Sequence, residues 1–516
     1  MRYVIRATAL CLCLILCLSL FACATPETPE DPKDETPEDN LPGTPEDPED
    51  DPVEKPEDPE DDPAEKPEDP KLPPEKIDPG VPADGVAGTF HVLHYTTANH
   101  EWTNPWDEIV PATGMEIAPG DLIGDDIFDR AAWLEQEYGI VVTSEYMDYG
   151  KLPTLLPQII KTGSTDYQLL DTMGRSAQKL MGNDYFLNIA ELPYIDFEHP
   201  WWVPGALEAL SLGDYVEFAV SDMLLIDKSA TMVLFFNIPM AEKIGLDGLY
   251  DDVRGHEWTL ERLAEYAELG FVPNGDDVMD ADDVYGIVTN DDPVHMLYAA
   301  AGRKFMSKNE DGTFYYSYGE GDSFTVMMDL LNTIMYADFT WNSYLKPEAP
   351  VFADGGALFN FDKLKRCMSL RDMVDDYGIL PLPMYDVDQA EYYGPVSNYH
   401  DSMFAVINTN QNNQETIGAA LELMSYFSYY EIYSDFFEVV IQNRGTRDAE
   451  SKEMLSIIFD NRSYDMGLIY DPHELTAKII RITGTHTDGV VSQWENFGNL
   501  REDTIAKINA LVDTYN

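Results

Sequence analysis

Basic residues are scarce in this chain of 516 residues, because 32 Lys and Arg stand against 95 Asp and Glu, for a net charge of -63. Such a charge repels polyanions, so nucleic acids and anionic lipid surfaces are poor partners. Cysteine is scarcer still, with five residues. Cys11, Cys13, Cys17 and Cys23 all fall within the first 23 residues. Only Cys367 is left for the rest of the chain, which excludes an intrachain disulfide there.

The first 23 residues follow the order of an export signal. Arg2 and Arg6 form a positive end, and the apolar run from Ala7 to Phe21 is short for a membrane span. Leu20-Phe21-Ala22-Cys23 resembles a bacterial lipobox, with Phe21 in the place of a small residue. The resemblance implies a signal peptide over 1–23, diacylglycerol on Cys23, and an extracytoplasmic protein anchored to the cell membrane. An ordinary signal peptide with a fortuitous Cys is the alternative.

Residues 24–86 are predicted to be a disordered, acidic, proline-rich tether. Ala24 to Gly80 holds 23 acidic and 5 basic residues, and 17 of the 34 prolines occur by Pro82. The run Pro-Glu-Asp-Pro begins at Pro45 and returns with a period of 11 residues. Proline blocks helix and sheet and like charges extend the chain, so we expect a spacer that reaches on the order of 180 Å. Calcium capture is the alternative, but the tether lacks the turn glycines of a calcium loop.

Strand and helix patterns alternate through the remaining residues, 88–516, where 44% hydrophobic content over the whole chain suffices for a large core. Apolar runs predict strands at 90–95, 140–142, 231–237 and 403–408. Apolar residues on one face predict a helix after Asp125 that stops at Gly139. Further helices are predicted from a Thr259 cap to Gly270 and over 417–430. This order favours an α/β fold with helices flanking a sheet, in two lobes.

Several segments together resemble the extracellular solute-binding protein family 1, the lipid-anchored carbohydrate receptors of ABC importers. The resemblance covers essentially all of residues 88–516. It is carried, in the family's order, by these segments: Asp125-Asp126-Ile127-Phe128-Asp129-Arg130, Leu192-Pro193-Tyr194-Ile195-Asp196 with Trp201-Trp202, Leu234-Phe235-Phe236-Asn237, Glu257-Trp258-Thr259-Leu260, Asp282-Asp283-Val284-Tyr285-Gly286, and Tyr377-Gly378-Ile379-Leu380-Pro381-Leu382-Pro383.

The resemblance implies a type II periplasmic-binding-protein fold with a ligand cleft between two lobes. Lobe one is expected over about 88–231 and 402–445, and lobe two over about 232–401 and 446–516. A monomeric receptor of this kind closes on its ligand, and an ABC-importer permease recognises the closed form. No cofactor, metal or chemistry on the ligand is expected. The alternatives are a secreted glycan hydrolase and a cell-surface adhesin or sensor on the same fold.

A sugar ligand requires aromatic rings for its C–H faces and polar groups for its hydroxyls. The expected ligand-binding residues are aromatic residues in polar loops and their polar neighbours: Glu101, Trp102, Trp106, Trp201, Trp202, Trp341, Tyr399, Asp401 and Trp494. Whether Trp201 and Trp202 lie in the cleft or in the core stays open. Trp258 and the aromatic residues of 426–433 are assigned to packing, because they follow a helix cap or recur at helical density.

Other chemistries have weak support in the sequence. Asn274, Asp276, Asp280 and Asp283 have the spacing of an EF-hand-like loop, but Val272 and Asp277 replace its first ligand and its turn glycine. We therefore expect that loop to bind no calcium. Phosphate-loop, zinc-protease and hydrolase motifs are missing from the sequence. Paired carboxylates for glycoside hydrolysis are available by number alone, because 72 acidic residues, 95 minus the 23 of Ala24 to Gly80, lie elsewhere in the chain.

Overall fold

The structure is a computed structural model that describes residues 76–96, 122–276, 278–289, 293–342, 352–397, 402–442, 449–484 and 489–515. Contacts divide the chain into Met1–Glu65 and Lys66–Asn516, and every described residue belongs to the second unit. The predicted signal peptide, Cys23 and most of the tether lie outside the described residues. Among the described residues, no helix combines the length and apolar character needed to cross a membrane.

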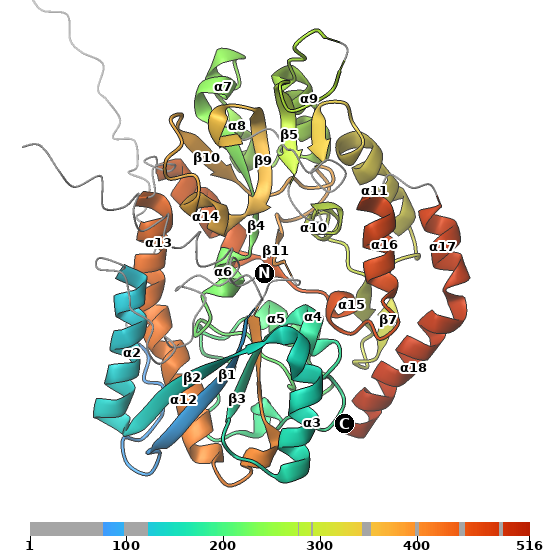
Figure 1. The fold of residues 1–516 in the computed structure, drawn as a ribbon. Helices are drawn as coiled ribbons and strands as arrows, with labels where there is room; N and C mark the ends of the chain where they lie inside the picture. The colour runs from blue at the N-terminus through green and yellow to red at the C-terminus, as the bar shows by residue number, and fades with distance from the viewer. Residues whose placement is uncertain are drawn as a thin grey trace, which may run out of the picture. The chain divides into compact units, whose positions relative to one another are not determined.

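The first sheet contains four strands in the order β12-β3-β1-β2. Their bounds are β1 Gly88–Thr96, β2 Ile140–Asp148, β3 Leu169–Met173 and β12 Ser402–Val406. β1 runs parallel to β2 and β3, whereas β12 runs antiparallel to β3. The connections through α2 (Leu122–Tyr138) and α3 (Leu152–Thr162) leave the sheet in opposite directions, so right-handed crossovers place these helices on opposite faces (Figure 1).

Helix α2 confirms the predicted amphipathic helix and begins three residues before Asp125. Ile127 and Leu134 are buried, as their spacing indicates. The helix ends where Gly139 adopts a φ of 67°, a left-handed conformation that costs a residue without Cβ little. Helix α12 (Gln414–Phe427) packs against both α2 and β1 and covers the same face of the sheet.

The second sheet contains five strands in the order β10-β4-β9-β5-β8. Their bounds are β4 Met232–Asn237, β5 Tyr285–Thr289, β8 Thr340–Asn342, β9 Ala357–Lys363 and β10 Tyr377–Leu380. β5 runs parallel to β8 and β9, while β4 runs antiparallel to β9 and β10. Two short pairs accompany this sheet, β6 Met306–Lys308 with β7 Phe314–Tyr316, and β11 Gly394–Pro395 with β13 Arg462–Ser463.

Helix α9 (Leu260–Gly270) forms as its sequence predicts. The Thr259 side chain accepts a hydrogen bond from the Arg262 N–H, which caps the first turn. Leu263 and Ala267 are buried against the sheet. At the other end of the helix, a Cβ on Gly270 would stand 2.7 Å from Leu358, so this close approach requires glycine.

The other helices complete the fold around the two sheets (Figure 1). Their bounds are α4 Gly174–Ala177, α5 Pro204–Leu210, α6 Ile226–Ser229, α7 Ile238–Lys243, α8 Leu249–Arg254, α10 Pro293–Ala300, α11 Ser323–Leu330, α13 Tyr433–Gln442, α14 Ala449–Asp460, α15 Met466–Ile469, α16 Leu475–Gly484, α17 Val490–Asn496 and α18 Gly498–Tyr515, with π-helical turns at Leu331–Met335 and Ser428–Ile432 and 3-10 turns at Tyr149–Lys151, Ile189–Glu191, Phe352–Asp354, Leu364–Met368 and Asn408–Asn410.

Each sheet takes its strands from one of the predicted lobes. The strands of the first sheet fall within 88–231 and 402–445, and those of the second fall within 232–401. The lobe boundaries themselves stay a prediction. Residues 76–86, the end of the predicted tether, lie against the body, because Val81 and Val86 are buried and the Ile77 N–H donates to the Tyr430 hydroxyl at 3.0 Å.

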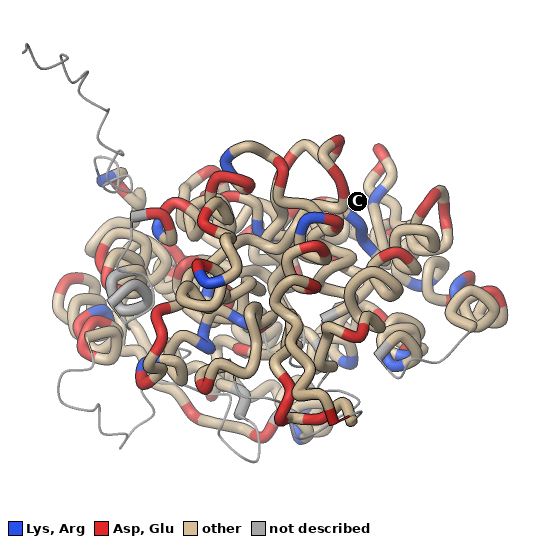
Figure 2. The backbone as a smooth tube through the Cα atoms, turned by 90° about the horizontal axis from the view of Figure 1, so that it is seen from above, with Lys and Arg blue, Asp and Glu red and all other residues tan. Residues whose placement is uncertain are grey.

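Acidic residues are spread over many elements of the body, and Lys and Arg are few among them (Figure 2). Exposed carboxylates are solvated by water and need no cation. The composition therefore describes a strongly negative surface around an ordinary apolar core.

Candidate functional site

The carboxyl ends of the parallel strands in both sheets border the passages of the chain between the sheets. In the second sheet, Met232 at the start of β4 pairs with Lys363 at the end of β9. In the first sheet, Ser402 at the start of β12 pairs with Met173 at the end of β3. Thr231 and Val396, which stand on the two passages, form an antiparallel bridge, so the passages lie side by side. In open α/β sheets, ligands bind outside the carboxyl ends of strands, and this junction is the candidate site.

On the first sheet, a row of polar residues crosses three strands near this edge. Tyr146, His94 and Asp171 are cross-strand neighbours in register, so their side chains share one face. His94 and Asp171 form a close ion-pair contact, and their side chains are 3% and 0% exposed. The Tyr146 ring meets the His94 ring edge-on, with centroids 4.9 Å apart. The row thus holds a histidine and a carboxylate in fixed positions inside the protein.

On the second sheet, the corresponding edge also buries polar groups. Thr289 and Asn342 end β5 and β8 and pair in register, and both side chains are buried. His295 on α10 is 2% exposed, and burial together with the charge of Lys363 lowers its pKa to about 3. The imidazole is therefore neutral at physiological pH and can both donate and accept a hydrogen bond.

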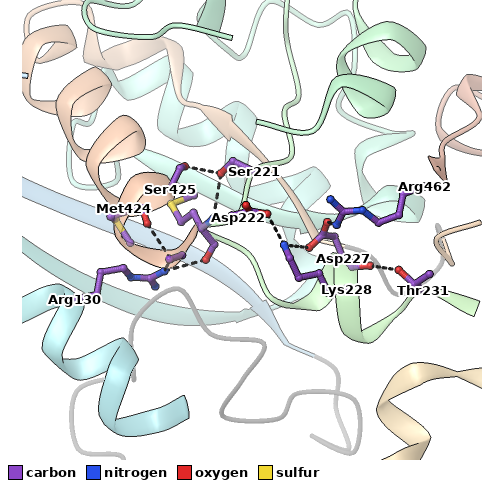
Figure 3. Close-up of polar contacts among 11 residues, drawn as sticks. Arg130, Ser221, Asp222, Asp227, Lys228, Thr231, Met424, Ser425 and Arg462 are labelled. Atoms are coloured by element: carbon purple, nitrogen blue, oxygen red, sulfur yellow. Dashed lines mark hydrogen bonds and ion pairs between the residues drawn. The ribbon is translucent and has the colours of Figure 1, made fainter. Parts of the chain in front are cut away.

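A cluster of four charged residues ties the passages together (Figure 3). Lys228 is 1% exposed, and its ammonium lies 2.5 Å from Asp222 and 3.4 Å from Asp227. Arg462 on β13 pairs closely with Asp227. Burial raises the pKa of Asp222, and the charges of Lys228 and Arg462 act against that rise. Two cations and two carboxylates thereby neutralise each other at the point where both sheet units and β13 meet.

Lys228 also connects this charge cluster to α13, because its ammonium lies 5.1 Å from the centre of the Tyr433 ring. Nearby, the fully buried Arg130 of α2 donates to the Met223 carbonyl at 3.1 Å and to the Ser428 hydroxyl at 2.5 Å (Figure 3). Burial lowers the pKa of Arg130 to about 9. These contacts fix the helices that flank the passages.

Five of the expected ligand-binding residues lie outside the described residues. They are Glu101, Trp102, Trp106, Tyr399 and Asp401. In the sequence, the first three follow β1, and the last two precede β12. Both of these strand ends belong to the candidate edge of the first sheet, and the five residues stay predictions.

Trp201 and Trp202 lie in the core, at 0% and 1% exposure. Each indole N–H donates to one oxygen of the buried Glu422 carboxylate on α12, at 3.0 Å. His199 contacts the same carboxylate at 2.5 Å through Nδ1. Burial raises the pKa of Glu422, and the hydrogen bonds from His199 and the two indoles oppose the rise. In this structure the two rings hold a buried acid and offer no face to a ligand.

Trp341 and Trp494 are also buried, at 3% and 1% exposure. Trp341 lies on β8 beside Asn342 and meets the Tyr285 ring edge-on at 5.1 Å. Trp494 on α17 packs between Tyr318 and the guanidinium of Arg501, which lies 4.9 Å from its ring. The four described tryptophans are therefore distributed over separate parts of the core. Trp341 alone of them stands at a carboxyl edge.

Trp258 fulfils its predicted packing role. Its ring is 0% exposed, and its N–H donates to the Pro381 carbonyl at 2.9 Å.

Several polar residues of the candidate site escaped the sequence analysis, which searched loops for aromatic residues. His94 and Asp171 stand near the ends of apolar strands, and Lys363 ends another strand. A polar residue that ends an apolar strand is a usable signal, because that strand end is where α/β sheets place ligands.

The acidic loop at 272–284 is closed by its own hydrogen bonds. The Asp283 carboxylate is buried and accepts from the Asn274 N–H at 2.7 Å and the Asp280 N–H at 3.0 Å. Val272 and Val284 bridge the ends of the loop. Within the described part of the chain, no group of three or more acidic, His or Cys residues is arranged to hold a metal ion. The carboxylate with EF-hand spacing therefore serves the backbone.

Two adjoining cavities lie beside α5, away from the polar rows of the sheet edges. Their volumes are about 400 and 530 Å³. Both are lined by Glu208, Gly302, Arg303 and Lys304. We call this pair of cavities the α5 groove. It runs between α5, which follows the first-sheet strands β1 to β3, and segments that accompany the second sheet.

No protein-family model matches the chain, and no curated protein matches it in sequence. Solved structures do match its fold. A sugar transporter protein from Rhizobium etli, in an open conformation, is 13% identical with a TM-score of 0.51 and covers 83% of this chain and 99% of its own. A cyclo/maltodextrin-binding protein complexed with maltotetraose is 12% identical with a TM-score of 0.50, covering 82% of this chain and 97% of its own. The chain thus has the two-sheet, periplasmic-binding-protein-like α/β fold that its sequence predicts.

Proposed function

We propose that the chain is a solute receptor that captures a small ligand, a mono- or oligosaccharide, between its two sheet units and delivers it unchanged to an ABC importer. One observation carries the proposal: both sheets direct their carboxyl ends to the junction of the passages, and buried polar side chains gather at both edges. Both matched structures are named for transport or binding of sugars, which agrees with this ligand class.

The ligand chemistry follows from the residues at the edges. Sugar hydroxyls need hydrogen-bond partners once water is excluded, and His295, Thr289 and Asn342 supply neutral groups that donate and accept. We propose that Trp102, Trp106 and the other predicted loop residues add the stacking rings and acids. A micromolar complex requires only about -8 kcal/mol, which a few such contacts provide.

The remaining parts of the proposal concern the place and the partners of the receptor. Cys23 would carry the lipid, residues 24–86 would hold the body away from the membrane, and lobe boundaries near 231, 401 and 445 would form the hinge. The body would act as a monomer, without a cofactor, and a permease would bind its closed form. A glycan hydrolase or an adhesin on this fold remains the alternative.

Titration of the full chain with a panel of neutral saccharides tests the ligand class. We expect a ligand at 100 times its dissociation constant to stabilise the protein by about 2.7 kcal/mol in a thermal-shift assay, with a change in tryptophan fluorescence. Chromatography of the recovered saccharide should show it intact. Cleavage of the saccharide would replace the receptor by a hydrolase, and the absence of any shift across the panel would contradict sugar capture.

A pair of variants tests the predicted stacking residues. Trp102→Ala should weaken binding about tenfold or more, because one stacking ring contributes about 1–2 kcal/mol. The matched control is Phe128→Ala on α2, whose ring is 59% exposed. Equal affinities of the two variants would remove Trp102 from the site.

A further inference from the structure

The α5 groove concentrates basic side chains in a chain that has few of them. Arg303, Lys304 and Lys308 line it within six positions, out of 32 Lys and Arg in the whole sequence. Its two cavities have the size of small-ligand sites, which measure roughly 300–1,000 Å³. None of the residues that line it belongs to the polar rows at the sheet edges, so it is a different place from the candidate sugar site.

Two of these three cations already have partners. Arg303 donates through one terminal nitrogen to Asp322 at 2.8 Å, but its buried Nε–H has no acceptor among the described residues. Lys308 donates to the Glu208 carbonyl at 2.5 Å and to the Ser211 hydroxyl at 3.1 Å. These bonds cap the C-terminal turn of α5.

Lys304 is different, because its ammonium makes no ion pair or hydrogen bond with any residue that the structure describes. It is half-buried and lines both cavities. Burial lowers the pKa of Lys308 to about 8; the charge of Glu208 opposes this and that of Lys304 adds to it. Two ammonium groups therefore repel each other across the groove, and an anion between them would relieve that repulsion.

The carboxylates that line the groove do not occupy Lys304. Asp465 is buried and accepts hydrogen bonds from the N–H groups of Phe305, Met306 and Gly467. Asp322 pairs with Arg303. The other acidic residues of the lining are exposed: Glu208, Glu320 and Asp460. Such exposed carboxylates can accept hydrogen bonds from the hydroxyls of a ligand.

An aromatic ring completes the lining. The half-buried Tyr393 ring lies directly on Gly302, where a Cβ would stand 3.1 Å from it. Glycine thus leaves space above the ring for a ligand. A flat aromatic surface beside hydroxyl acceptors is suited to the C–H face of a sugar ring.

We propose that the α5 groove is a second binding site, which takes an acidic saccharide of the uronic acid type. Lys304 and the Arg303 Nε–H bind the carboxylate of the sugar, Tyr393 stacks on its ring, and the exposed acidic residues accept hydrogen bonds from its hydroxyls. This site is independent of neutral sugar binding at the sheet edges.

Calorimetric titration of the full chain with a galacturonic acid trisaccharide, and with its neutral galactose counterpart, tests the proposal. We expect the acidic trisaccharide to bind and Lys304→Met to weaken it about tenfold or more, because a charge-assisted hydrogen bond is lost. The matched control, Lys243→Met, removes an exposed lysine of α7 and should leave the affinity unchanged.

Inorganic phosphate and sulfate form the other arms, since a carboxylate and an inorganic anion share the same recognition chemistry. Tight binding of phosphate with no preference for the uronate would overturn the saccharide assignment, and equal affinities of Lys304→Met and Lys243→Met would overturn the site. The Trp102→Ala variant separates this proposal from the proposed function, because that change should affect the neutral sugar and leave uronate binding intact.

Discussion

Replacing Glu217 by Gln tests how burial acts on a carboxyl group of the first-sheet unit. Glu217 is 0% exposed, and both of its oxygens accept from the Gly182 N–H at 3.0 Å. Among the described residues it pairs with no Lys or Arg. Burial raises its pKa from 4.5 to about 8, the Gly182 bond opposes the rise, and the negative charge of Asp184 adds to it.

The sign of the effect on stability follows from this rise in pKa. Between pH 4.5 and about 8 the unfolded chain releases the proton while the folded chain keeps it, so unfolding becomes easier as pH increases. The full contribution is present below 4.5 and lost above about 8. At about 1.4 kcal/mol per pKa unit, this rise corresponds to a penalty on the order of 5 kcal/mol at alkaline pH.

Gln retains the oxygen that accepts from Gly182 but carries no charge, so Glu217→Gln should remove the penalty. Thermal unfolding of wild type and variant between pH 5 and pH 9 measures it. With an unfolding entropy of about 2.1 cal/mol/K per residue over a body of about 430 residues, the variant should gain about 5 °C at pH 9. Its gain at pH 5 should be small.

The difference between the two proteins is the measured quantity, because every other titrating group contributes equally to both. Glu242→Gln on α7, an exposed position, controls for the loss of a negative charge. A gain from Glu217→Gln that is the same at pH 5 and pH 9 would refute the reasoning, since it would show that burial does not hold the proton on Glu217.

Three further changes have expected costs that thermal unfolding can measure. Trp202→Phe removes one donor from the buried Glu422 and should cost about 1–3 kcal/mol, whereas no loss would show that the bond is replaced. Gly286→Ala would place a Cβ 2.1 Å from a carbonyl oxygen of α9 and should cost at least about 3 kcal/mol; normal stability would contradict this packing. Tyr515→Ala removes a ring stacked at 3.9 Å on Tyr215, for about 1 kcal/mol, and a double-mutant cycle with Tyr215→Ala should show the coupling.

The sequence predicted the regular elements well, because local signals determine them. The Thr259 cap and the Gly270 end of α9 are both present, and the strand predicted at 231–237 is β4. The apolar helix predicted over 417–430 is α12 followed by a π-helical turn. Strand order is a different matter. The pairing of β12 with β3 joins residues more than 200 positions apart, and the fold class came from the resemblance to a family.

The candidate site was less accessible to sequence reasoning, because burial depends on long-range packing. Trp201 and Trp202 share the signature of a ligand platform, two large rings in a polar segment, with that of a core anchor. Glu422, more than 200 residues away, decides the matter by accepting both indole N–H groups. In the same way, the pair of His94 and Asp171 arises only when β1 and β3 lie in register.

The scarcity of basic residues gives the buried charges at the junction a clear physical meaning. Solvated carboxylates on the surface need no cation, so the chain can tolerate 95 acidic residues with 32 basic ones. A carboxylate in the interior does need compensation, and Asp222 and Asp227 receive it from Lys228 and Arg462. Because removal of either cation would leave a buried charge uncompensated, these contacts hold the passages, and with them the two sheet edges, in register for a ligand.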